Sequence, residues 1–178
     1  MIKVDRLLIG LFIASFLLLA GCSRNIDSMT DAEKEAAIQD AMEKDPPKFM
    51  NDEQMGEEAR MADFLNDGRI IKSGSFQGKA HPTTGSISII EKNGENYVVL
   101  SDDFKSDAGP ELHLFVEEHS NPGNSKDIHS GEYVDLGLLK STSGAQTYKI
   151  DKEKIGKINS ATVYCKPFRV IFGLATIS

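Results

Sequence analysis

Hydrophobic positions follow three successive patterns along the chain. Leu7 to Ala20 is a predominantly apolar run of 14 residues, and the short start before it holds two basic residues. Apolar residues then recur at helical spacing as far as about residue 66. From residue 70 onward they form short runs separated by Gly, Asn and Pro, which is typical of β-strands and turns. The chain therefore divides into a leader, a helical segment and a β region.

The β region contains eight runs of strand-like composition. They are residues 70–78, 84–90, 96–102, 111–118, 133–140, 145–150, 160–166 and 168–177. Asn93-Gly94, between the second and third runs, is a strong signal for a two-residue hairpin. No helical pattern separates the runs, so we predict a mainly β fold, an antiparallel β-sandwich or barrel of about eight strands. Residues 119–132 are predicted to form a long surface loop.

One predicted strand shows regular alternation. Leu112, Leu114 and Val116 share a face, which we expect to point into the core. His113 lies on the opposite face of the same strand.

Two helices are predicted before the β region. Thr30 to Glu33 fits a capping box at the start of the first helix, and Pro46-Pro47 ends it. Its narrow apolar face consists of Ala37, Ile38, Ala41 and Met42. A second helix is predicted over 52–66, and we expect it to pack on the domain or on a partner. The first is expected to be weakly ordered, because isolated helices of this length are marginal in water.

Charge separates the helical segment from the β region. Residues 23–67 hold 13 acidic and 5 basic residues, whereas residues 68–178 hold 13 of each. Nucleic-acid binding requires a basic surface, so this distribution argues against a nucleic-acid partner. We therefore expect an acidic, partly helical tether at 22–67 and one β domain at 68–178.

The leader ends in a short motif. A positive start and a short apolar run are typical of a secretory signal peptide, predicted here at 1–21. Leu19-Ala20-Gly21-Cys22 resembles the lipobox of bacterial lipoproteins. The resemblance implies cleavage before Cys22 and fatty acylation of its thiol. Several acyl chains would hold the protein on the cell membrane or outer membrane, facing outside the cytoplasm.

The β region carries four ordered segments with a recognisable pattern. They are GSFQGKAHPTTGSISI (74–89), LSDDFKSDAGPELHLFV (100–116), VDLGLLKSTSGAQTYKI (134–150) and ATVYCKPFRVIFGLATI (161–177). Together they resemble the DM-thirteen domain family, a small extracellular β module proposed to act in electron transfer. The resemblance spans about residues 72–178, and the tether lies outside it.

Cys165 is the one cysteine that follows Cys22. The resemblance implies a role for it, because the family's proposed electron-transfer role rests on a recurring cysteine at this position. The residues leave three interpretations open. Cys165 is a small buried hydrophobic residue, or its thiol exchanges with a partner protein, or it ligates a metal or haem together with His81.

The sequence lacks the motifs of hydrolases, phosphate-binding loops and dinucleotide-binding turns. An enzyme is therefore the less favoured class. We predict a membrane-anchored extracytoplasmic lipoprotein with a redox or electron-transfer role through Cys165 and a protein redox partner. The alternative is a non-catalytic binding module on the cell surface, in which Cys165 is a buried structural residue.

Overall fold

The computed structural model describes residues 25–178. The predicted signal peptide and Cys22 lie outside the described residues, and their predictions stay untested. The eight predicted strands all form, and the mainly β, antiparallel fold is confirmed. These strands are β1 (Arg69–Gly78), β3 (Ser86–Lys92), β4 (Glu95–Leu100), β6 (Leu112–Glu117), β7 (Tyr133–Leu138), β8 (Gln146–Lys149), β9 (Ser160–Cys165) and β10 (Val170–Thr176). A separate ribbon pairs β2 (Thr83–Thr84) with β5 (Lys105–Ser106).

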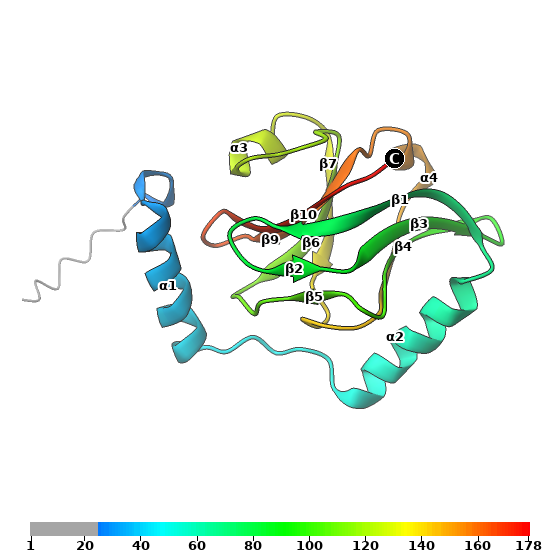
Figure 1. The fold of residues 1–178 in the computed structure, drawn as a ribbon, viewed down its shortest axis with the longest axis horizontal. Coiled ribbons are helices and arrows are strands. Elements are labelled where there is room, and N and C mark those ends of the chain that lie inside the picture. Colours follow the sequence, from blue (N-terminus) through cyan, green and yellow to red (C-terminus); the bar gives the residue numbers. More distant parts are fainter. Residues whose placement is uncertain (1–24) are drawn as a thin grey trace, which may run out of the picture.

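The main sheet curls into a nearly closed barrel (Figure 1). Its strand order is β7-β6-β9-β10-β1-β3-β4-β8, so β7 and β8 are the two edges. Side chains close part of the gap between these edges. The buried Gln146 of β8 accepts from Lys140 N at 2.8 Å and donates to Ser141 O at 2.8 Å. The sheet edge is thus joined to the segment that follows β7.

Local sequence signals produce the local structure that they predict. The β3–β4 hairpin turns at Asn93 and Gly94, whose φ values are 55° and 82°. Positive φ at both central positions is the geometry of a type I′ turn, which Asn-Gly favours. Leu112, Leu114 and Val116 of β6 point into the core, as the alternation predicts.

The opposite face of β6 is also covered. Phe115 packs with Ile128, Tyr164 and Ile171 beneath the 119–132 loop, which contains the short helix α3 (Ser125–Ile128). Glu117, the last residue of β6, is 1% exposed. The loop is therefore a second packed layer on the barrel and not merely a surface connection. Another short helix, α4 (Lys152–Ile155), lies between β8 and β9.

Two longer helices precede the barrel. A short turn of 3-10 helix, η1 (Ile26–Ser28), is followed by α1 (Asp31–Lys44), and α2 (Asp52–Leu65) comes after an extended linker. Both α1 and α2 begin with a capping box, at Thr30 and Asn51 respectively. Figure 1 shows α1 beside the β9–β10 end of the barrel and α2 beneath β4.

The helix α2 is fixed to the edge strand β8 by a carboxylate. Glu58 accepts from Thr147 N at 2.7 Å, from Thr147 Oγ1 at 2.9 Å and from Lys140 Nζ at 2.6 Å. An exposed strand edge presents unpaired N–H groups, and Glu58 satisfies one of them. Leu65 at the end of α2 is fully buried against Ile90 and Tyr97. The predicted packing of the second helix on the domain is confirmed.

Candidate functional site

Cys165 lies at the end of β9, in the main core. Its Cα pairs with Leu112 of β6 and with Val170 of β10. The residue is 0% exposed, and its thiol donates to Pro110 O over 3.2 Å. The segment that bears this carbonyl passes close over the core. A Cβ at Gly109 would lie 2.6 Å from the Phe172 ring, so glycine is needed there.

The environment of the thiol favours its protonated form. Burial raises the pKa of Cys165 to about 11, the Glu111 carboxylate adds to the rise, and a backbone hydrogen bond from Phe168 opposes it. The two cations next to Cys165 in the sequence have other partners. Lys166 pairs with Asp135 at 3.0 Å, and Arg169 pairs with Asp27 at 2.7 Å. Neither supplies the positive charge that a reactive thiolate needs.

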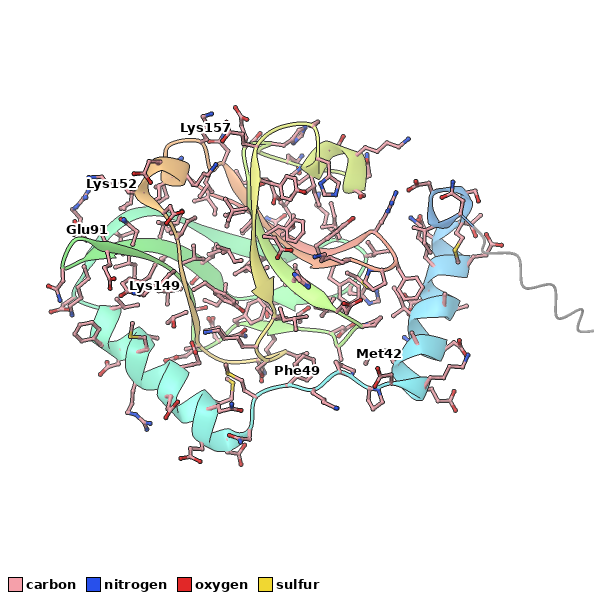
Figure 2. The ribbon with its side chains drawn as sticks, turned by 180° about the vertical axis from the view of Figure 1, so that it is seen from behind. Met42, Phe49, Glu91, Lys149, Lys152 and Lys157 are labelled. Carbon is pink, nitrogen blue, oxygen red and sulfur yellow. The ribbon has the colours of Figure 1, made fainter. Side chains whose placement is uncertain are left out.

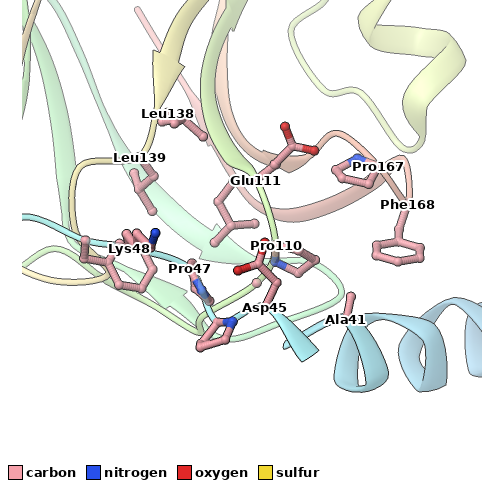
Figure 3. Close-up of a pocket in the computed structure, with 14 residues that line it drawn as sticks. Ala41, Asp45, Pro47, Lys48, Pro110, Glu111, Leu138, Leu139, Pro167 and Phe168 are labelled. Atoms are coloured by element: carbon pink, nitrogen blue, oxygen red, sulfur yellow. The ribbon is translucent and has the colours of Figure 1, made fainter. Parts of the chain in front are cut away.

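A surface hollow adjoins the cysteine. It has a volume of about 490 Å³, and Figure 3 shows one side of it formed by the barrel and the other by α1 and the linker. Most of its lining is apolar: Ala41, Asp45, Pro46, Pro47, Lys48, Phe49, Gly109, Pro110, Glu111, Leu112, Leu138, Leu139, Pro167 and Phe168. We call it the Pro110 hollow. The thiol itself lies behind its wall, because Pro110 accepts the thiol proton and Leu112 pairs with Cys165.

Backbone strain is concentrated beside the thiol. Glu111 has a φ of 45° and Arg169 a φ of 54°, although neither is glycine. Lys166 N donates to Glu111 O over 3.4 Å, so the two strained segments meet at the end of β9. Strain of this kind clusters at functional sites in proteins, where the surrounding structure enforces it.

His81 lies on the loop between β1 and β2, beneath α1. Its ring stacks on Phe172 with centroids 3.8 Å apart. Its Nε2 lies 3.2 Å from the Glu35 carboxylate of α1, and its Nδ1 lies 3.5 Å from Asp107. The side chain is 10% exposed. The Nε2–Glu35 contact has an ion-pair distance but lacks the alignment of a good hydrogen bond.

The two predicted site residues lie at the same end of the barrel with different partners. The Cys165 thiol is bonded to Pro110, whereas the His81 ring lies between Glu35 and Asp107. Among residues 25–178 no three His, Cys, Asp or Glu side chains are grouped as metal ligands would be. The donor set around Cys165, one buried thiol facing a carbonyl, does not fit a metal or haem.

The remaining histidines lie away from the thiol. His113 Nδ1 is 2.7 Å from Asp135, and His119 Nδ1 accepts from Asn121 N at 3.2 Å. His129 packs against Tyr133 and Tyr164 in the layer outside β6.

A buried acid was missed by the sequence analysis. Glu117 Oε1 accepts from Ser160 at 3.1 Å and its Oε2 lies 3.4 Å from Thr162 Oγ1, and no cation faces the carboxyl among the described residues. Burial raises its pKa to about 7, although the two hydroxyls lower it. Strand alternation placed this position on the outer face, and no local signal showed that the 119–132 loop would cover it.

We compared the chain with known proteins, and one family matches the barrel region. No curated protein and no solved structure gave a significant match. Within the described part of the chain, no helix is both long enough and apolar enough to cross a membrane. The model of one protein family, described as Electron transfer DM13, matches residues 75–177. The match includes His81 and Cys165 and excludes α1 and α2. Because it covers more than half of the chain, this protein belongs to the Electron transfer DM13 family.

Proposed function

We propose that this chain is a lipid-anchored protein of the cell envelope whose DM13 domain serves a redox process through Cys165. The observation that carries the proposal is the family match, which includes Cys165, the sole cysteine among residues 25–178. The lipobox-like motif at Cys22 supports the location. Acylation of Cys22 would also leave Cys165 without an internal disulfide partner.

The chemistry that suits a single thiol is exchange with a disulfide of an exported partner protein. Cys165 would lose its proton to solvent, and its sulfur would attack one sulfur of that disulfide. A mixed disulfide forms, and the partner's other sulfur leaves as a thiolate. The Cys165 sulfur is oxidised and the released sulfur is reduced, so the electrons balance without a further reagent.

The geometry favours a second candidate, a binding module without chemistry. Cys165 is wholly buried, and burial raises the pKa of its thiol to about 11. In this candidate, Cys165 is a packed core residue, and the Pro110 hollow is the surface that binds a partner.

Disulfide exchange in the native state separates the two candidates. The purified chain and its Cys165→Ser variant are incubated with glutathione disulfide at neutral and alkaline pH. Mass spectrometry then measures mixed disulfide on the peptide that contains residue 165. The redox proposal expects a mixed disulfide that a second thiol releases. A native thiol that stays unmodified for as long as the fold persists would support the binding module instead.

The anchor is tested separately. Mass spectrometry of the N-terminal peptide is expected to find acylated Cys22 as the first residue, and Cys22→Ala is expected to release the protein from membranes. An intact Met1 together with an unmodified Cys22 thiol would contradict the anchor and leave the redox question open.

A further inference from the structure

We propose that residues 26–49 form a removable cover on the Cys165 end of the barrel, and that the thiol becomes accessible when this cover leaves. The cover comprises η1, α1 and the first part of the linker. The inference deepens the proposed function, because it concerns the regulation of Cys165. Its test is the rate at which a reagent alkylates the Cys165 thiol, and that rate does not depend on redox activity.

The cover lies outside the region that the family model matches. The family match begins at residue 75, whereas the cover ends at residue 49. The barrel does not need the cover to complete its sheet, because the cover supplies no strand. It is an addition to the matched region, and its residues Ala41 and 45–49 line the hollow whose opposite wall includes Pro110, the partner of the thiol.

One apolar side chain anchors the cover. Ile38 is 1% exposed and belongs to the same core cluster as Cys165. Met42, one turn later, is partly buried against that cluster, and Figure 2 shows it on the side of α1 that faces the barrel. The other side chains of α1 are exposed or half-buried. A 14-residue helix is marginal in isolation, so these few contacts decide whether it stays docked.

Two polar contacts hold the cover beside the site. Asp27 pairs with Arg169, which lies in the turn directly after β9, and both side chains are about half-exposed. Glu35 faces His81, whose other ring nitrogen faces Asp107. An ion pair as exposed as Asp27–Arg169 stabilises weakly and is screened by salt. The polar contacts therefore orient the cover without fixing it firmly.

The linker can serve as the hinge. Residues 45–50 have no helical or strand structure, and Pro46-Pro47 prevents the continuation of α1. Met50 N donates to Lys140 O at 2.9 Å, so the far end of the linker is fixed where α2 begins. Between these points the linker spans the Pro110 hollow and forms one of its walls. Movement of the cover would widen the hollow toward Pro110, Pro167 and Phe168, the segments next to the thiol.

The rate at which a maleimide alkylates Cys165 measures whether the cover is docked over the thiol. Each full-length variant is treated in its native state, and its rate is divided by that of the same variant unfolded in guanidinium chloride. The peptide containing residue 165 is followed, so that any modification at residue 22 does not contribute. Ile38→Asp is expected to raise the native rate at least about tenfold, because a buried group reacts only through local opening.

Ala36→Asp is the matched control. It introduces the same charge into the same helix at an exposed position, and its rate is expected to equal that of the wild type. Hydrogen exchange shows whether the barrel survives. In Ile38→Asp, amides of α1 should exchange faster while those of β9 and β10 stay protected. If β9 and β10 also lose protection, the double variant Asp27→Asn, Glu35→Gln replaces it, with a smaller rise expected.

Loss of α1 protection without faster alkylation would overturn the cover, and so would equal rates in the Ile38 and Ala36 variants. Fast alkylation without disulfide exchange would support the cover and contradict the redox proposal.

Discussion

Helices α1 and α2 are alike in length and capping but differ in how the barrel holds them. Each has 14 residues, a capping box and acids in its first turn. The carboxylate of Glu58 accepts two hydrogen bonds from Thr147 of β8 and one from Lys140, and Leu65 is fully buried. Helix α1 has the buried Ile38 and a contact from the half-exposed Glu35 to the His81 ring, and the turn before it adds the half-exposed Asp27–Arg169 ion pair. The comparison teaches that a helix becomes part of a domain when its polar contacts are buried with it.

The largest expected effect is at the apolar end of α2. Leu65→Ala should lower the free energy of unfolding by about 3 kcal/mol, because it leaves a cavity against Ile90 and Tyr97. Ile38→Ala removes a similar side chain but should lower it by less than about 1 kcal/mol, because α1 can undock while the barrel stays folded. Chemical denaturation of both variants measures the difference. Equal losses would show that α1 is as integral to the fold as α2.

Glu117 provides a contrast to Glu58, because both carboxyls are shielded from solvent but, within the described residues, only Glu58 has a cationic partner. Its folded pKa of about 7 exceeds the ordinary value of 4.5. Its contribution to stability is therefore fully present below about pH 4.5 and is lost as pH rises through 7. Glu117→Gln should be stabilised relative to the wild type by an amount that reaches on the order of 3 kcal/mol above pH 8.

Unfolding experiments on the Glu117 pair at pH 4, 6 and 8 test this sign. A constant difference between the two proteins across that range would show that Glu117 is not buried as an uncompensated acid.

Glu58 should show the opposite pH dependence with a smaller magnitude. Burial raises its pKa, but hydrogen bonds from Lys140 and Thr147 outweigh burial and lower it below 4.5. Its stabilisation is present above that value and is lost as pH falls through the folded pKa. Glu58→Gln should cost about 1–2 kcal/mol at pH 7 and almost nothing under acidic conditions.

Glu57→Gln is the control for Glu58. It makes the same chemical change at the neighbouring exposed position of α2 and should leave stability unaltered at both pH values. If the two variants lose the same stability, the Glu58 contacts do not hold the helix.

The smallest effect is expected at the ionic contact of the cover. Asp27→Asn should change the free energy of unfolding by no more than about 0.5 kcal/mol, because the Asp27–Arg169 pair is half-exposed. It should nevertheless raise the native alkylation rate of Cys165 slightly, and added salt should do the same in the wild type. A stability loss as large as that of Glu58→Gln would remove the contrast between the helices.

The elements that the sequence predicted are those with local causes. The Asn93-Gly94 turn, the alternation of Leu112, Leu114 and Val116, and the capping box at Thr30 each depend on residues a few positions apart. The sequence could single out Cys165 as a candidate residue, but it could not predict the surroundings of the thiol. The bond from Cys165 to Pro110 joins residues 55 positions apart, and the contact between Arg169 and Asp27 joins residues 142 positions apart.

The sequence by itself determined the strands, the helices, the charge difference between tether and barrel, and the resemblance that singles out Cys165 and His81. The tertiary structure alone decided that Glu117 is buried, that His81 faces Glu35 and not Cys165, and that α1 lies over the site. The reason is physical. Backbone preferences and periodicity act over a few residues, whereas burial and pKa depend on which distant segments pack together.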